Sequence, residues 1–305
     1  MDGTTGVEEY PQEVTAWLRR GVLPVRYMYT GSGAALHIGF AEEYPDEYVD
    51  GRCAHETAVI TRGLGRARLP AQVCDIGPSN GVHTHQFLTW FARQHRGPAR
   101  YLGVDVSREV LEAARERNRP HASVEQHFAT WDIESTATAP VEPWRAPGPV
   151  LFCLFGNTLG NVEDPAHVLR NVFRGARPGD ILVLGLYGPP RPGRQDAAAY
   201  RSPAVREMIT GPLTAAGLPR HSFSLELSTA AEAVVGTARL TVPVSLPGAC
   251  LPAGHEIRCF LSRRFRPAGA HRLLRDTGWL PRPPSAAPSD GHFVVLGERM
   301  PSSPG

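Results

Sequence analysis

Two acids and two glycines are spaced as a nucleoside-binding site requires. Asp75, Gly77 and Gly81 belong to a segment that begins with an apolar run at Val73, and Asp105 ends a second apolar run. Glycine has no side chain, so the backbone at Gly77 and Gly81 can approach a ligand closely. An acid at the tip of the next strand is placed to accept both hydroxyls of a ribose. These residues predict a nucleoside site; the alternative is a glycine turn between a strand and a helix that holds no ligand.

The form of the glycine turn distinguishes between classes of nucleoside cofactor. A dinucleotide site has Gly-x-Gly-x-x-Gly, whereas this chain has Asp75-x-Gly77-x-Ser79-x-Gly81. The second form resembles motif I of class I methyltransferases, which hold S-adenosylmethionine. That cofactor has no pyrophosphate, so the third glycine of the dinucleotide motif is not required. The resemblance implies S-adenosylmethionine as the cofactor.

Ligands of doubly wound sheets bind outside the carboxyl ends of the strands, so residues after the other apolar runs are also candidates. Asp132 follows the expected strand 124–128 and is placed to accept the adenine amino hydrogens, with Ile133 packed on the ring. The alternative for Asp132 is a loop acid or a helix cap. The residues assigned to the cofactor are Asp75, Gly77, Ser79, Gly81, His83, Asp105, Val106, Asp132, Ile133 and Phe155.

Strands and helices alternate through the middle of the chain. Apolar runs predict strands over 73–76, 101–104, 124–128, 150–155 and 181–186, and helices are expected from near Thr84, over 108–118 and over 165–174. This alternation predicts an α/β fold of the class I methyltransferase (Rossmann-like) type, with a mostly parallel sheet covered on both faces.

The flanking segments predict an auxiliary α+β subdomain that covers the substrate. A helix is expected over 11–23, and the glycine-rich stretch 27–56 carries many aromatics. After the Pro189-Pro190 break, a helix is expected over 198–217, one or two antiparallel strands over 223–244, a strand over 257–262, a helix over 268–277 and a strand over 292–296. We therefore divide the chain into an N-terminal substrate segment (1–60), a cofactor-binding core (61–187), a substrate-covering insertion (188–256) and a return to the core with a disordered tail (257–305). The alternative for 188–256 is a surface excursion.

Composition excludes several classes of function. A net charge of +2 argues against nucleic acid as a partner, and the absence of long apolar runs argues against a membrane span. The five cysteines form no C-x-x-C pair and no signal peptide is evident, which is typical of a cytoplasmic protein. All 32 basic residues are arginine, so lysine chemistry is excluded. His83 and His85 have no evident third ligand, so no metal is expected. The sequence does not specify the oligomeric state.

A more specific resemblance rests on short segments between residues 25 and 297. The string Gly156-Asn-Thr-Leu-Gly-Asn161 is similar to the Gly-Ser-Thr-Ile-Gly-Asn string of the histidine N-alpha-methyltransferase family of the ergothioneine pathway. Segments of the same family also resemble Arg177–Gly185, Ser262-Arg-Arg-Phe-Arg-Pro267, Tyr27-Met-Tyr29 and Glu47-Tyr48-Val-Asp-Gly-Arg52.

The resemblance implies which residues face the methyl acceptor. Tyr27 or Tyr29, Tyr48 and Asn161 would lie at the catalytic centre, with Asn161 on the amino-acid-like part of the acceptor. Asn157, Phe260 and Ser262 would line the acceptor pocket. Without the resemblance, these tyrosines are equally compatible with core positions.

Three positions depart from the family pattern. The chain has His83 where the family has a lysine, Ser79 where it has a second glycine, and Phe260 where it has a glutamate. Burying an imidazole against phenylalanine leaves its nitrogens unpaired, at a cost of about 1–3 kcal/mol. Histidine is therefore not the expected substrate.

The sequence predicts an S-adenosylmethionine-dependent methyltransferase that N-methylates a small amino-acid-derived or specialised metabolite other than histidine. Such an enzyme mainly aligns the nucleophile with the methyl group, and a tyrosine hydroxyl orients the nucleophile or takes its proton. One alternative is a C-, O- or S-methyltransferase acting on an aromatic or peptide natural-product acceptor. A second is a non-catalytic nucleoside-binding module, against which Gly77 and Gly81 argue.

Overall fold

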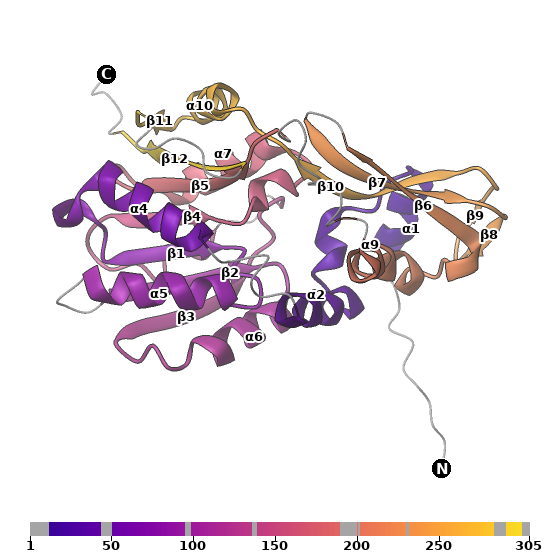
Figure 1. Cartoon of the computed structure of the whole chain (residues 1–305), viewed down its shortest axis with the longest axis horizontal. Helices are drawn as coiled ribbons and strands as arrows, with labels where there is room; N and C mark the ends of the chain where they lie inside the picture. Colours follow the sequence, from indigo (N-terminus) through magenta and orange to yellow (C-terminus); the bar gives the residue numbers. More distant parts are fainter. Residues whose placement is uncertain are drawn as a thin grey trace, which may run out of the picture.

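A large α/β part and a smaller α+β part lie side by side in the computed structural model (Figure 1). The structure describes residues 12–43, 51–94, 99–135, 139–189, 200, 202–229, 232–283 and 291–300. The large part contains a seven-stranded sheet in the order β11-β12-β5-β4-β1-β2-β3. The small part contains a three-stranded sheet in the order β10-β7-β6 and a two-stranded hairpin of β8 and β9.

Five adjacent strands of the large sheet are parallel. They are β1 (Gln72–Ile76), β2 (Ala99–Asp105), β3 (Val124–Thr130), β4 (Val150–Leu154) and β5 (Ile181–Tyr187). Beyond β5, strand β12 (His292–Glu298) and the edge strand β11 (Leu280–Pro281) pair antiparallel. The predicted α/β fold with a mostly parallel sheet is confirmed.

Side chains of the central strands alternate between two cores, one on each face of the sheet. Val73 and Leu151 pack with Phe87 in one core, and Cys74 and Phe152 pack in the other. Both faces are covered by helices, which explains why β1 and β4 are apolar and buried throughout most of their length. The helices of the large part are α4 (Arg52–Leu64), α5 (Val82–Gln94), α6 (Arg108–Asn118), α7 (Pro165–Gly175) and α10 (Pro267–Asp276), with short 3-10 turns η2 (Arg66–Arg68) and η3 (Thr158–Gly160).

The small part combines the N-terminal residues with the segment after β5. Its strands are β6 (Phe223–Thr229), β7 (Ala233–Leu240), β8 (Val244–Leu246), β9 (Ala249–Leu251) and β10 (Glu256–Arg263). Its helices are α1 (Gln12–Arg19), η1 (Val25–Met28), α2 (Ser32–Glu43), α9 (Pro203–Ala215) and η4 (Arg220–Ser222). A third core joins them, in which Leu18 and Met28 pack with Ile209 and Phe260.

Some expected boundaries differ from the structure. The strand expected to return to the core at 257 is β10, which instead pairs with β7 because its buried residues, among them Ile257 and Leu261, complete the small core. Helix α4 belongs to the large part although it begins within 1–60, since Cys53 and Ile60 pack beside β1. The helix expected over 11–23 ends at Arg19.

Candidate active site

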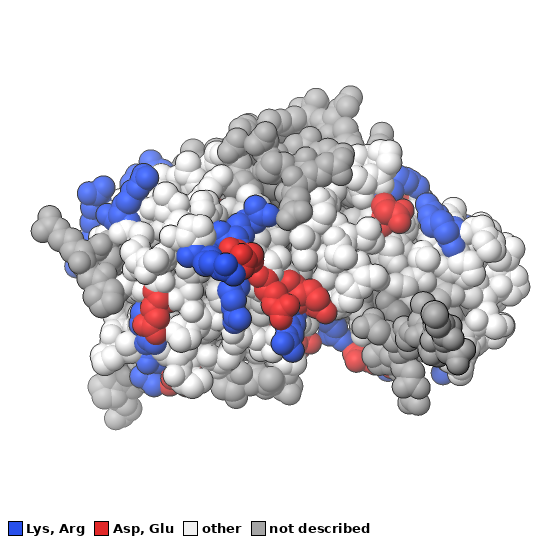
Figure 2. All heavy atoms as spheres, turned by 90° about the horizontal axis from the view of Figure 1, so that it is seen from below, with Lys and Arg blue, Asp and Glu red and all other residues white. Residues whose placement is uncertain are grey.

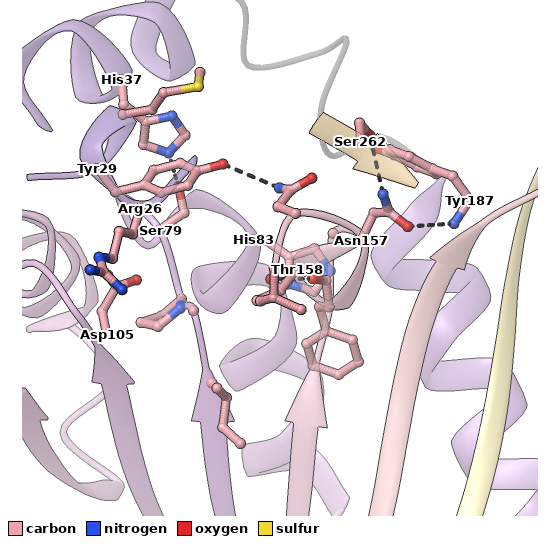
Figure 3. Close-up of a pocket in the computed structure, with 18 of the residues that line it drawn as sticks. Arg26, Tyr29, His37, Ser79, His83, Asp105, Asn157, Thr158, Tyr187 and Ser262 are labelled. Atoms are coloured by element: carbon pink, nitrogen blue, oxygen red, sulfur yellow. Dashed lines mark hydrogen bonds between the residues drawn. The ribbon is translucent and has the colours of Figure 1, made fainter. Parts of the chain in front are cut away.

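A cavity of about 750 Å³ lies at the carboxyl ends of β1, β2, β4 and β5, where the two parts meet. The large part contributes the tips of the parallel strands, as expected for a doubly wound sheet. The small part contributes Tyr29, His37, Met208, Phe260 and Ser262. Figure 3 shows Asp105 at one end of this cavity, Ser262 and Tyr187 at the other, and Tyr29 on the wall near Asp105.

The glycine turn after β1 contributes to the cavity through Gly77 but not through Gly81. Gly77 has φ +79, and a Cβ there would lie 3.1 Å from Oγ1 and Cγ2 of Thr158. Gly81 has φ +82, and a Cβ there would lie 2.8 Å from Cα of Ala114 on α6. Gly81 is absent from the cavity wall, so its small size serves the packing of α5 against α6.

Asp75 holds the turn in place from beneath. Its buried carboxylate accepts hydrogen bonds through Oδ2 from the hydroxyls of Thr84, at 3.0 Å, and Tyr101, at 2.9 Å. Burial raises the pKa of Asp75, although the charge of His83 and these two hydrogen bonds oppose that effect. The carboxylate ties the end of β1 to α5 and β2.

Asp105 presents its carboxylate to the cavity at the end of β2. One oxygen accepts the backbone N–H of Ser107 at 3.0 Å, and burial raises the pKa of Asp105 to about 6. Backbone hydrogen bonds from Ser107 and Val106 lower the pKa, but burial outweighs them. A carboxylate in this position suits the two hydroxyls of a ribose.

The wall beside Asp105 combines apolar residues with further acids, among them Asp132. Val106, Trp131 and Ile133 line it and suit the faces of a purine ring. Asp132 also lines it; its Oδ1 accepts the N–H of Glu134 at 2.9 Å, and its Oδ2 lies 3.6 Å from Nη1 of Arg26. One carboxylate oxygen of Asp132 therefore stabilises its own loop, as the loop-acid alternative expects, and the other faces the guanidinium of Arg26. An adenosyl group fits this arrangement, which consists of the glycine turn at Gly77, the carboxylate of Asp105 and the apolar wall.

Two histidines share a buried glutamate on the floor of the cavity. Nε2 of His83 lies 2.5 Å from Oε2 of Glu56, and Nε2 of His292 lies 3.2 Å from Oε1. Burial alone raises the pKa of Glu56, but the charge of His83 and the neighbouring His292 outweigh burial and hold it at about 2. Burial lowers the pKa of His83, but Glu56 outweighs burial and raises it. Glu56 thus favours the protonated form of His83, whose ring lies 4.9 Å from the ring of Phe155.

Tyr29 and Asn161 meet across the cavity from different parts of the chain. Nδ2 of Asn161, after η3, donates to the hydroxyl oxygen of Tyr29 at 3.2 Å. Burial and the charge of Asp105 raise the pKa of Tyr29 to about 12, so its hydroxyl is protonated at neutral pH. The ring of His37 lies edge-on to Tyr29, with 4.8 Å between centroids, and its Nε2 lies 2.7 Å from Oγ of Ser79. Burial lowers the pKa of His37 to about 4, so this imidazole is neutral.

Asn157 joins the loop after β4 to the small sheet. Its Nδ2 donates to Oγ of Ser262 and to the carbonyl of Arg263, and its Oδ1 accepts the N–H of Tyr187 (Figure 3). Its backbone has φ +66, a region that asparagine tolerates better than most residues. Asn157 lines the cavity, but these bonds make it a positioning residue for Ser262.

Most of the predicted site residues come together in this cavity, and two of the described ones, Tyr27 and Gly81, do not line it. Tyr27 packs in the small core with the guanidinium of Arg26 over its ring, outside the cavity wall. Gly81 lies against α6, as described above. Tyr48 lies outside the described residues. The predicted residues that line the wall are Tyr29, Asp75, Gly77, Ser79, His83, Asp105, Val106, Asp132, Ile133, Phe155, Asn157, Asn161, Phe260 and Ser262.

Several wall residues escaped prediction. Tyr187 ends β5, so the strand-tip rule that selected Asp105 would have found it. Arg264 lies two residues beyond Ser262, and Trp131 directly precedes Asp132. Arg52 ends the Glu47–Arg52 segment that resembles the family, so that resemblance could have selected it. His37 carries no comparable signal, since it lies on helix α2 within the stretch where no helix was anticipated.

The fold and this cavity define a class I S-adenosylmethionine-dependent methyltransferase. A family model described as "Histidine-specific methyltransferase, SAM-dependent" matches residues 10–205, and the chain belongs to this family. The matched segment includes Tyr29, Asp105 and Asn161 but ends before β10, which carries Phe260 and Ser262.

Comparison with solved structures returns further methyltransferases at low identity. Magnesium protoporphyrin IX methyltransferase from Synechocystis, with bound S-adenosylhomocysteine, has a TM-score of 0.49 and 12% identity over 90% of this chain and 98% of its own. A methyltransferase from Clostridium acetobutylicum has a TM-score of 0.47 and 10% identity over 86% of this chain and 97% of its own. The sugar N-methyltransferase KedS8 from Streptoalloteichus has a TM-score of 0.45 and 14% identity over 86% of this chain and 93% of its own. No curated protein sequence matches the chain.

Two further features bear on partners. Within the described part of the chain, no helix has the length and apolar character needed to cross a membrane. On the face seen in Figure 2, arginines lie beside carboxylates across the middle of the molecule rather than in a field of one sign.

Proposed function

We propose that this methyltransferase N-methylates a small amine-bearing metabolite, amino-acid-derived or specialised, other than histidine. S-adenosylmethionine, when bound, supplies a methyl group on a positively charged sulfur. Asp105 would hold its ribose, the wall of Val106, Trp131 and Ile133 its adenine ring, and the Gly77 turn would allow close backbone approach. A cavity of about 750 Å³ is in the range of small-molecule sites.

The observation that carries the choice of nitrogen is the bond between Asn161 and Tyr29. Because Nδ2 of Asn161 donates to Tyr29, its amide oxygen Oδ1 remains as an acceptor, and it accepts no hydrogen bond from the described residues. An amine N–H can donate to this oxygen while the nitrogen lone pair points at the methyl group. The Tyr29 hydroxyl, protonated at neutral pH, adds a second point of contact.

The wall around Phe260 supports the exclusion of histidine. Phe260 is buried and packs against the ring of Tyr200, with 5.6 Å between centroids. The neighbouring Arg264 brings a positive charge to the same wall. Neither side chain has a hydrogen-bond acceptor, so neither can pair with the N–H of an imidazole placed beside it.

The proposal is tested by a methyl-transfer assay on a panel of acceptors. Purified protein is incubated with S-adenosylmethionine and amino acids, biogenic amines, phenols and thiols, and S-adenosylhomocysteine and methylated products are identified by mass spectrometry. The expected product is an N-methylated amine with little turnover of histidine. Methylation confined to phenols, thiols or carbon would instead support the C-, O- or S-methyltransferase alternative.

A further inference from the structure

The cavity is polarised, with its acids gathered at one end. The acidic residues on the described wall are Asp75, Asp105, Asp132 and Glu134, which follow strands β1 to β3. The wall at the other end, near β5 and β10, carries two guanidinium groups, those of Arg52 and Arg264. The adenosyl site and this second region are thus of opposite charge.

The two arginines meet on the ring of Tyr187. The guanidinium carbon of Arg264 lies 4.9 Å from the centroid of that ring and the guanidinium carbon of Arg52 lies 5.8 Å from it. Arg52 donates to the hydroxyl of Tyr187, and Arg264 donates to the hydroxyl of Tyr200 at 3.1 Å. The hydroxyl of Tyr200 is neutral, so this contact leaves the charge of the Arg264 guanidinium unneutralised.

Arg264 has donor capacity to spare. Its Nε is buried and has no hydrogen-bond partner among the described residues, and no described carboxylate forms an ion pair with it. A buried, unpaired donor on a charged group is costly unless a ligand satisfies it. The hydroxyl of Ser262, which accepts from Asn157, can donate its own proton toward the same region.

We propose that the methyl acceptor carries an anionic group, a carboxylate or one of similar size, remote from its amine, and that Arg264 binds this group beside Tyr187. The inference rests on the proposed function, because the amine is placed at Tyr29 and Asn161. Guanidinium groups match planar oxyanions in shape, and such hydrogen bonds are stronger than neutral ones. The rings of Tyr187, Tyr200 and Phe260 supply an apolar wall for the linking atoms.

The test compares probes that differ only in the remote group. Protein saturated with S-adenosylhomocysteine is titrated by calorimetry with 4-carboxy-, 4-carbamoyl- and 4-aminomethyl-L-phenylalanine, and with the shorter set L-glutamate, L-glutamine and L-ornithine. In at least one set the carboxylate should bind about ten-fold or more tightly than the amide, and the cation should bind least. The inference is overturned if neither carboxylate is preferred.

Variants locate the effect. Arg264→Gln should abolish the preference for the carboxylate probe, Arg264→Lys should retain part of it, and Arg266→Gln should leave it intact, since Arg266 is exposed two residues away and does not line the cavity. A uniform loss of affinity for all three probes of a set would mean that Arg264 binds the α-carboxylate they share, and would overturn the inference.

A second measurement tests whether Arg264 binds the acceptor or the amino-acid part of the cofactor. The affinity for S-adenosylhomocysteine, relative to methylthioadenosine, which lacks the amino-acid part, should be the same in Arg264→Gln as in the wild type. A loss of about ten-fold confined to S-adenosylhomocysteine would assign the arginine to the cofactor's carboxylate and overturn the inference. Absence of binding of either nucleoside by the wild type would instead contradict the proposed function.

Discussion

The side-chain amide of Asn157 lies 3.3 Å from the hydroxyl of Ser262, which ties the loop after β4 to strand β10 of the small sheet. The same amide accepts the N–H of Tyr187 at 3.0 Å, so one side chain connects β4, β5 and β10. These residues lie 105 positions apart in sequence at the widest, yet they form one wall of the cavity. The acceptor end of the site therefore depends on how the two parts of the chain are held together.

Replacing Asn157 by alanine should destabilise the protein and weaken acceptor binding. The variant removes the acceptor of the half-buried N–H of Tyr187, at a cost of up to about 1–3 kcal/mol. It also places alanine, which has no polar side chain to stabilise this conformation, at φ +66. Asn157→Gly removes the same hydrogen bonds without the backbone strain, so it should be the more stable of the two. Equilibrium unfolding measures both; identical stability of wild type and Asn157→Ala would contradict the positioning role.

Asp105 makes cofactor affinity depend on pH. Its pKa in the ligand-free protein is raised to about 6, so the carboxyl becomes neutral as the pH falls through that value and loses its strength as an acceptor for ribose hydroxyls. Affinity for S-adenosylhomocysteine should be constant above about pH 7 and decrease below about pH 6. Asp105→Asn should bind about ten-fold or more weakly and lack this inflection. Calorimetry at several pH values measures this affinity in both proteins. If the inflection persists in Asp105→Asn, another group is responsible for the pH dependence.

The Glu56–His83 pair should stabilise the protein within a limited pH range. The pKa of Glu56 is lowered, so its contribution is present above the usual 4.5 and lost as the pH falls toward 2. The pKa of His83 is raised, so its contribution is complete below the usual 6.5 and lost as the pH rises through the raised value. Stability from this pair is therefore greatest between these limits.

Glu56→Gln tests the pair directly. It should lower the free energy of unfolding by about 3–5 kcal/mol near pH 6, because a buried charge loses its partner. The difference from wild type should narrow at higher pH as His83 becomes neutral. Denaturant titrations at pH 6 and pH 9 measure it, and a pH-independent difference would mean that the carboxylate acts through packing alone.

Asn161 should position the acceptor rather than the cofactor. Asn161→Ala should lower kcat/KM by about ten-fold to a hundred-fold through misplacement of the nucleophile, with the affinity for S-adenosylhomocysteine nearly unchanged. Tyr29→Phe removes the partner hydroxyl, and the double variant should lose less than the sum of the two single losses. Strict additivity in steady-state kinetics would show that the two residues act independently; a destabilised variant with normal kinetics would reduce Asn161 to a structural role.

The parallel core of this fold was predictable because its strands are buried on both faces. Such strands are apolar runs in the sequence, and acids or glycines at their ends mark where they stop. Residues such as Asp105 and Asn161 were found because the carboxyl ends of parallel strands gather at one edge. The small part was harder to place, since antiparallel pairing of β10 with β7 joins residues distant in sequence and local patterns do not specify the partner.

The residues that escaped prediction have physical reasons in common. His37 and Glu56 lie on helices in a stretch rich in glycine and aromatics, where the apolar period is weak, and their function arises only from contacts with Ser79 and His83 across the fold. Local sequence does not specify the place of Arg264, because its stacking on Tyr187 depends on how β10 meets β5. Tyr27 was chosen with Tyr29 from one motif, and the 3-10 turn η1 sends only Tyr29 into the cavity.

We propose that this enzyme methylates nitrogen on an acceptor other than histidine. The most direct measurement is a competition in one vessel, with methyl-deuterated S-adenosylmethionine, equal amounts of histidine and a panel of amines, and product identification by tandem mass spectrometry. We expect the label on the nitrogen of a non-histidine amine, with at most a minor fraction on histidine, and we expect Asp105→Ala to reduce all labelling. Dominant labelling of the histidine α-nitrogen, or labelling on carbon, oxygen or sulfur only, would contradict this proposal.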